Sequence, residues 1–247
     1  MKIVRSFIIA WVSLFVVFGT AVIAKAADKD VSALDAKKTA GQEGLVSAKA
    51  VDKDVLNPDQ ALQRLISGNQ HYASAQFTHP NQMSKRRMEL CSGQHPFATI
   101  IGCSDSRVPP EIIFDQGLGD LFIIRVAGNV VDDLVLGSIE YAADHLHTPL
   151  IMVLGHEKCG AVTATVEGGE AHHGHFDAFM KAIKPAVDKV KALSGDKVDN
   201  AVRANVKRVV EQLKSSNPIL AELVKEGKLK IVGARYDLDT GLVDILH

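Results

Sequence analysis

Residues 150–160 read LIMVLGHEKCG, in which an unbroken apolar run meets a histidine, two charged residues and a cysteine. A second stretch of this kind, residues 97–107, reads FATIIGCSDSR. Short apolar runs without polar alternation are typical of strands that are covered on both faces, as in a parallel sheet. Each run ends in polar side chains, and α/β folds place their ligands at the carboxyl ends of parallel strands. The two stretches therefore predict buried strands with functional residues at one end of a sheet.

The sequence between and after these stretches predicts the rest of an α/β fold. Leu121–Val126 is a third apolar run, and Asp133–His147 carries apolar residues near helical period. A strand, a helix and a strand at this spacing are typical of a βαβ unit. A final strand pair, Leu229–Tyr236 and Leu242–Leu246, flanks the hairpin-type turn Asp239-Thr240-Gly241. We expect a central, mostly parallel β-sheet that is flanked by helices.

Residues 57–247 are expected to form a single α/β domain. Its first helix should begin at the N-cap Asn57 and end at Gly68, which reads as a stop signal. Residues 177–226 are helical in pattern, with breaks at Gly195-Asp196 and Asn217-Pro218. Before this domain, residues 27–56 lack a sustained apolar period, and we expect them to be a flexible lead-in.

Residues 1–26 have the layout of a secretory signal peptide. A short basic start precedes an apolar run from Phe7 to Ala24, and Ala24-Lys25-Ala26 forms a cleavage signal. We expect cleavage after Ala26 and a periplasmic or secreted protein. The alternative is an uncleaved membrane anchor, for which the apolar run is barely long enough.

The overall charge gives no indication of a nucleic-acid or membrane partner. The 247-residue chain has a formal net charge of −1, and removal of the leader would make it −4. Such a mild acidic balance exerts no strong pull on nucleic acid or on anionic lipid, so we expect neither partner after processing. Three cysteines, an odd number, do not make a disulfide framework in an exported chain. Cys91 is expected to be a small buried core residue.

Cys103, His156 and Cys159 follow two predicted strands and are candidate ligands for zinc. Two thiolates and an imidazole suit zinc, and three protein ligands leave one position open, as in catalytic sites. His156 and Cys159 lie three residues apart, so both could face one ion from the start of a helix. Four other interpretations stay open at this point: core cysteines, a core histidine, a closed structural site with Cys91 as a fourth ligand, and a thiol nucleophile paired with histidine.

The two motifs together resemble those of the β-class carbonic anhydrases, in particular their plant-like branch. Cys-Ser-Asp-Ser-Arg at 103–107 is followed, 53 residues after its cysteine, by Gly-His-x-x-Cys-Gly. The likeness extends over roughly residues 55–246 and includes Gly128-Asn129, the segment 139–142 and the closing residues 233–241. The resemblance implies an α/β fold with a parallel core. It also implies one zinc per chain on Cys103, His156 and Cys159, and a homodimer or homotetramer.

Reversible hydration of carbon dioxide to bicarbonate and a proton is the activity that this resemblance implies. Asp105 could orient the attacking hydroxide, and Arg107 could hold the Asp105 carboxylate through its forked donors. The alternative for this pair is a structural salt bridge. By resemblance, the substrate pocket would be formed by four residues: Gln94, Phe122, Ala127 and Tyr141.

Two further positions bear on regulation and proton transfer. Another branch of the family carries a tryptophan three residues before the first ligand cysteine, as part of a bicarbonate regulatory site. Here that position is Ile100, so we expect no such site. The histidines at 172, 173 and 175 could shuttle protons, but a solvated loop is the simpler interpretation. Rival functions are hydrolysis of carbonyl sulfide or carbon disulfide on the same fold, and a non-catalytic zinc-stabilised module.

Overall fold

A computed structural model describes residues 56–168 and 174–247. The expected signal peptide, nearly all of the expected lead-in, and the loop residues His172 and His173 lie outside these described residues. The described residues belong to one compact unit. None of their helices is long and apolar enough to cross a membrane.

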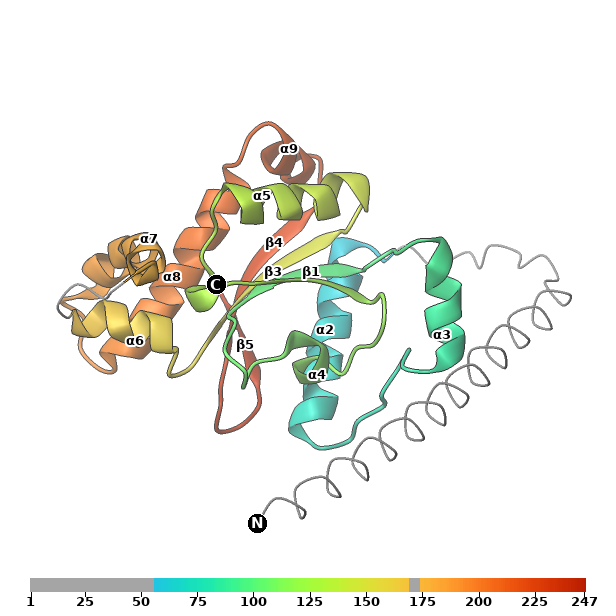
Figure 1. The fold of residues 1–247 in the computed structure, drawn as a ribbon, viewed down its shortest axis with the longest axis horizontal. Coiled ribbons are helices and arrows are strands. Elements are labelled where there is room, and N and C mark those ends of the chain that lie inside the picture. The colour runs from blue at the N-terminus through green and yellow to red at the C-terminus, as the bar shows by residue number, and fades with distance from the viewer. Residues whose placement is uncertain (1–55, 169–173) are drawn as a thin grey trace, which may run out of the picture. The chain divides into compact units, whose positions relative to one another are not determined.

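Five strands form one sheet in the order β2-β1-β3-β4-β5 (Figure 1). The strands are β1 (Ala98–Gly102), β2 (Leu121–Arg125), β3 (Leu150–His156), β4 (Lys230–Tyr236) and β5 (Val243–Leu246). The first four are parallel, and β5 pairs antiparallel with β4. This arrangement confirms the expected α/β fold with a mostly parallel sheet. The two stretches that ended in cysteine and histidine lie on adjacent strands, because β1 pairs with β3.

Eight helices of the described residues flank this sheet: α2 (Pro58–Ala73), α3 (Ser84–Glu89), α4 (Pro110–Ile113), α5 (Asp133–Glu140), α6 (Gly160–Glu167), α7 (Phe176–Val190), α8 (Lys197–Lys214) and α9 (Ile219–Lys225). Short turns of helix also occur at η1 (Leu90–Ser92), η2 (Ala127–Asn129) and η3 (Tyr141–His145). The breaks predicted between α7, α8 and α9 are confirmed. The helix expected over 133–147 changes at Tyr141 into one π-helical turn, η3. The sequence did not indicate α3 or α4, because helices this short carry no periodic apolar face.

Two hydrophobic cores lie on the two faces of the sheet. Along β1, Ile100 belongs to the core that α2 covers, and Ile101 belongs to the core beneath α5 and α8. Figure 1 shows α2 and α4 on one side of the sheet, with α5 and α9 on the other. Every residue of β1 and β3 is therefore buried, which explains why these strands read as unbroken apolar runs.

The first helix corrects one expectation about where helices stop. Asn57 caps α2 through a capping box with Gln60, as the sequence predicted. However, the helix passes through Gly68 and ends only at Ala73. A Cβ on Gly68 would lie 1.9 Å from the Phe114 carbonyl oxygen. Gly68 is thus a point of close packing between α2 and the segment after α4, and it is not a stop signal.

Cys91 corrects a second expectation. Its side chain is exposed, and its Sγ lies 3.6 Å from the carbonyl oxygen of Arg87. The short helices α3 and η1 that carry this residue bury none of their side chains. Residue type alone favoured a buried thiol, but the burial of a cysteine depends on whether its element packs against the core.

Gly68→Ala should destabilise the protein, whereas Gly137→Ala should not. The new methyl group at position 68 would overlap a backbone oxygen, and overpacking of this kind costs roughly 1–3 kcal/mol. Gly137 is also helical, but a Cβ there meets nothing within 4 Å. Alanine at 137 should stabilise the protein by up to about 1 kcal/mol, because it forms helix better than glycine. Urea unfolding of both variants measures the difference, and equal midpoints would contradict the packing explanation.

Candidate metal centre

The carboxyl ends of β1 and β3 bring together Cys103, His156 and Cys159. Cys103 follows β1, His156 is the last residue of β3, and Cys159 is the N-cap of α6. The side chains of all three are buried, and their candidate ligand atoms lie within 4.8 Å of one another. The sequence predicted this convergence, but it placed His156 at the start of a helix. In the structure His156 still belongs to the strand, so the strand and the helix each contribute one ligand.

The orientation of the His156 imidazole leaves one nitrogen free for a ligand. Nδ1 lies 2.8 Å from the carbonyl oxygen of Glu157, so this nitrogen carries the proton and donates. Nε2 is buried, and no described residue forms a hydrogen bond with it. A backbone carbonyl that fixes the ring and its tautomer is a common partner of metal-binding histidines. An orphaned buried nitrogen therefore faces the two sulfur atoms.

The spacing of the sulfur atoms fits a single tetrahedral ion. Cys103 Sγ and Cys159 Sγ lie 3.9 Å apart. Two Zn–S bonds of ~2.3 Å at the tetrahedral angle would separate the sulfurs by about 3.8 Å. Two thiols and an imidazole also match the ligand types that zinc prefers. The residues thus fit zinc in both donor type and spacing.

The pKa values of the two thiols shift in opposite directions. The hydrogen bond with the Cys159 thiol lowers the pKa of Cys103 to about 4, against the opposing effect of burial. The same contact, together with burial, raises the pKa of Cys159 well above its ordinary value. One thiolate therefore forms readily, while the second needs a positive partner. A divalent cation held by Cys103 and Cys159 would supply that charge, because metals bind cysteines as thiolates.

A carboxylate and a guanidinium lie beside the three ligands. Arg107 Nε donates to Asp105 Oδ1 at 2.9 Å, and Arg107 Nη2 donates to Asp105 Oδ2 at 2.7 Å. The bidentate bond with Arg107 lowers the pKa of Asp105 to about 2, so this carboxylate stays ionised at neutral pH. Asp105 Oδ2 lies 3.8 Å from His156 Nε2. The ionised oxygen therefore faces the region that the ligand atoms surround.

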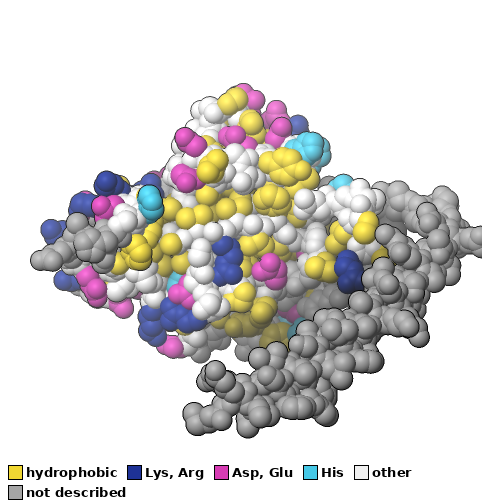
Figure 2. Space-filling model, viewed as in Figure 1, with side chains coloured by type: hydrophobic (Ala, Val, Ile, Leu, Met, Phe, Trp, Pro, Cys, Tyr) yellow, Lys and Arg dark blue, Asp and Glu magenta, His cyan; other side chains and the backbone are white. Residues whose placement is uncertain are grey.

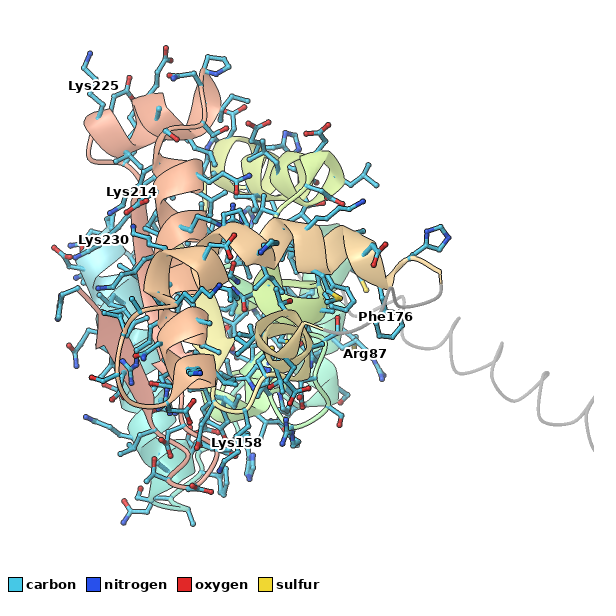
Figure 3. The ribbon with its side chains drawn as sticks, turned by 90° about the vertical axis from the view of Figure 1, so that its left-hand side faces the viewer. Arg87, Lys158, Phe176, Lys214, Lys225 and Lys230 are labelled. Atoms are coloured by element: carbon cyan, nitrogen blue, oxygen red, sulfur yellow. The ribbon has the colours of Figure 1, made fainter. Side chains whose placement is uncertain are left out.

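The backbone of both ligand loops is held by arginine. Arg107 Nη2 also donates to the carbonyl oxygen of Lys158, at 3.2 Å, and so ties the two loops together. Lys158 has a φ of +51°, a left-handed conformation that aims this carbonyl. Figure 3 shows Lys158 toward one end of the molecule and Lys225, at the end of α9, toward the other. The two loops thus form one unit at a single end of the sheet.

Arg125 is a supporting residue that the sequence reasoning missed. It is the last residue of β2, and its Nε donates to the Cys103 carbonyl oxygen at 2.9 Å. Its Nη2 donates to the Asp105 carbonyl oxygen at 2.5 Å. One arginine thus fixes the backbone on both sides of Ser104. The only available signal was an arginine that ends an apolar strand, which by itself indicates no partner.

Three of the four predicted pocket residues lie away from the candidate metal ligands of the same chain. Phe122 pairs in register with Thr99, which is four residues before Cys103 and so about 13 Å away along β1. Its ring lies 6.2 Å from that of Tyr141, which is 47% exposed. Gln94 is exposed and precedes β1, at the other end of that strand from Cys103. Ala127 lies in η2, directly before the residue that donates to Cys103 Sγ.

Two other sequence candidates lie away from the centre. Cys91 belongs to η1, before β1 begins, so it is at the wrong end of that strand to be a fourth ligand. His175 is exposed directly before α7. The described residues do provide an imidazole beside the aromatic pair, because the ring of His145 stacks on Tyr141 at 4.9 Å. The spacing of four residues between these rings is the only sequence signal for this contact.

Comparison with known proteins identifies the family of this chain. The family model described as carbonic anhydrase matches residues 98–243. A carbonic anhydrase of Mycolicibacterium smegmatis is 41% identical over 192 residues, which cover 76% of this chain and 93% of that protein. The chain belongs to the β-class carbonic anhydrase family.

Solved structures agree with this assignment. A Coccomyxa β-carbonic anhydrase in complex with acetazolamide superposes with a TM-score of 0.61 at 30% identity, covering 75% of this chain and 86% of that one. A β-carbonic anhydrase from Sordaria macrospora, described as tetrameric, gives a TM-score of 0.60 at 27% identity. That match covers 75% of this chain and 96% of the other.

Replacement of Cys159 by serine should remove most of the bound metal. The change takes away one of the two buried sulfur atoms that lie 3.9 Å apart, and a hydroxyl is a poor zinc ligand. Cys91→Ser is the matched control, because Cys91 is exposed and precedes the opposite end of β1. Metal analysis of the purified proteins should give about one zinc per chain for the parent and for Cys91→Ser. Loss of metal from the Cys91 variant would support a closed structural site in which Cys91 is the fourth ligand.

Proposed function

We propose that the protein is a zinc-dependent carbonic anhydrase that converts carbon dioxide and water reversibly into bicarbonate and a proton. The observation that carries the proposal is the pairing of a three-ligand cluster with an ionised Asp105 held by Arg107. A structural metal site needs four ligands and no such carboxylate. Family membership and the carbonic anhydrase of M. smegmatis support the same activity.

The residues of this chain divide the work between holding the metal and orienting the reactants. Cys103, His156 and Cys159 would hold zinc and leave one position open. When bound, zinc lowers the pKa of a coordinated water from 15.7 to about 7 and so supplies hydroxide at neutral pH. The ionised Asp105 carboxylate would accept a hydrogen bond from the attacking oxygen and would orient its lone pair toward the carbon of carbon dioxide. Arg107 keeps Asp105 ionised and in place, through two side-chain bonds.

Two rival interpretations of the cysteines lose support from the geometry. A cysteine nucleophile is usually partly exposed, but Cys103 is only 5% exposed and Cys159 only 1%. A closed structural zinc site lacks its fourth ligand among the described residues, because Cys91 lies elsewhere. Hydrolysis of carbonyl sulfide or carbon disulfide would use the same metal chemistry. We favour carbon dioxide because carbonic anhydrase relatives match 91–93% of their own length.

A second copy of the chain would complete the substrate pocket. Among the described residues, no strand pairs with the outer side of the edge strand β2, and all five of its residues are half-buried. Figure 2 shows hydrophobic side chains gathered in a band across the middle of one face of the molecule. Tyr141 and Leu134 are exposed apolar residues of the chain segment that follows β2. We propose that this face forms a homodimer, alone or within a tetramer, and that Phe122 and Tyr141 line the partner's site.

The proposal also includes the location of the enzyme and the absence of a bicarbonate regulatory site. The leader over residues 1–26 supports a periplasmic or secreted enzyme that is processed after Ala26. We also place the protein in the plant-like branch, without a bicarbonate regulatory site. Ile100, which stands where the other branch has tryptophan, is fully buried in the core between the sheet and α2.

Arg107→Ala and Asp105→Ala should both keep zinc and lose most of the hydration activity. All three metal ligands remain in each variant, so metal content should stay near one per chain. Loss of the oriented carboxylate should lower kcat on the order of 100-fold, the scale of a misplaced reacting group. In Arg107→Ala the freed carboxylate, 3.8 Å from His156 Nε2, can itself reach a metal there. Stopped-flow hydration assays and metal analysis on the same samples measure both quantities.

Arg203→Ala is the matched control for these two variants. Arg203 donates to Asp199 at 2.7 Å within α8, an arginine–aspartate pair outside the site. This variant should hydrate carbon dioxide at the parental rate. Near-parental rates in the Asp105 and Arg107 variants would overturn the assigned mechanism. A much higher kcat/KM for hydrolysis of carbonyl sulfide than for hydration of carbon dioxide would instead identify carbonyl sulfide as the preferred substrate.

Leu134→Glu should weaken the oligomer and lower activity together. Leu134 is 84% exposed, so the substitution removes almost no packing within the chain but puts a charge on the apolar face. Leu193→Glu is the control, because Leu193 is also exposed, at 55%, but follows α7. Sedimentation should show dimers or larger species for the parent and the control, and smaller species for Leu134→Glu. A monomeric parent with full activity would refute the shared pocket.

A further inference from the structure

The backbone N–H of Gly128 contacts the candidate metal centre, and Gly128 has a left-handed backbone conformation. Its N–H lies 3.4 Å from Cys103 Sγ and donates to that sulfur. Gly128 has a φ of +70°, and Asn129, directly after it, has a φ of +45°. Glycine and asparagine adopt left-handed conformations more readily than other residues, but rarely in succession, so we expect contacts around this turn to hold it. A Cβ on Gly128 would lie 2.6 Å from Cδ1 of the buried Ile183, so a side chain here would also force Ile183 to shift.

Asn205 fixes this turn from the middle of α8. Its Nδ2 donates to the Gly128 carbonyl oxygen at 2.9 Å, across 77 residues of sequence. This carbonyl belongs to the peptide that follows the Gly128 Cα, and the N–H that reaches Cys103 belongs to the peptide before it. Fixing one peptide plane therefore limits the rotation of the other. Val202, Val206 and Val209 are fully buried on the same helix, so Asn205 projects from a firmly packed support.

Stability does not explain why an asparagine occupies this place. Asn205 is 1% exposed, and its Oδ1 has no hydrogen-bond donor among the described residues. A buried amide that is only half satisfied costs free energy, and an apolar side chain of the same shape would suit the core better. Asn69 shows the contrast, because its buried amide uses both ends, with three backbone partners.

We propose that Asn205 is a positioning residue for the metal centre, which acts through Gly128 on the Cys103 sulfur. By fixing the turn, it keeps an N–H aimed at the thiolate and keeps the sulfur in place for the metal. Supporting residues of this kind typically change metal affinity by about 10- to 100-fold. The inference rests on the proposed zinc site but assigns a new role, to a residue outside the ligand set and outside the Asp105–Arg107 pair.

Two substitutions of Asn205 test the proposal by zinc affinity and by the spectrum of the cobalt-loaded protein. Asn205→Leu replaces the amide donor by an apolar side chain of similar size. Asn205→Asp replaces it by a carboxylate of nearly the same shape that cannot donate. Competition with a chromophoric chelator should show zinc affinity lowered about 10-fold or more in both variants. In the cobalt-loaded proteins, the thiolate-to-cobalt absorption band should move to longer wavelength, because the sulfur loses a hydrogen bond. Thermal unfolding of the metal-free Asn205→Leu protein should stay near that of the parent.

Asn69→Leu is the matched control for a purely structural role. It removes three hydrogen bonds between α2 and backbone outside the ligand loops, so the fold should lose stability. Its zinc affinity and cobalt spectrum should nevertheless stay parental. The proposal is overturned if Asn205→Leu binds zinc with parental affinity and shows an unchanged cobalt band. It is also overturned if zinc affinity follows unfolding temperature across the Asn69 and Asn205 variants alike. A parent chain that binds no zinc would instead refute the proposed function itself.

Discussion

The parallel pairing of β1 with β3 is the constraint on which the rest of the structure depends. It places the loop after β1 beside the loop after β3, so that Cys103 meets His156 and Cys159 although more than 50 residues separate them. Both strands are buried on both faces, and their apolar side chains hold the register. A shift of one residue would move every side chain to the opposite face and would separate the ligands. The hydrophobic cores thus fix the geometry of the metal centre.

Charge at the site is arranged so that each buried ionised group has a partner. As two thiolates, the sulfurs would carry negative charge that a divalent cation would offset, and Arg107 balances Asp105. Arg125 neutralises no acid here but donates to two carbonyl oxygens of the same loop. The loop that carries a ligand and the orienting carboxylate is therefore fixed through its backbone, while the side chains stay free for chemistry.

The exposed edge at β2 explains why one chain forms a ligand cluster without a complete pocket. Phe122 and Tyr141 lie together on this edge, and Phe122 is about 13 Å along the sheet from Cys103 of its own chain. An unpaired strand edge that exposes apolar surface is a template on which another chain can pair. An enzyme of this design would couple its assembly to its activity, because the same surface would bury the edge and supply the wall of the pocket.

The sequence by itself determined the strands, the candidate ligand set and the Asp105–Arg107 pair. These features rest on short-range patterns, namely apolar runs, an i to i+2 charge pair and residue types that suit one metal. Tertiary structure alone decided that Gly68 is a packing contact, that Cys91 is exposed, and that Gln94 lies away from the ligands. It also decided the roles of Arg125 and Asn205, which bind backbone carbonyl oxygens. Every residue carries such a carbonyl, so the acceptor leaves no mark in the sequence, and only the fold shows which one is reached.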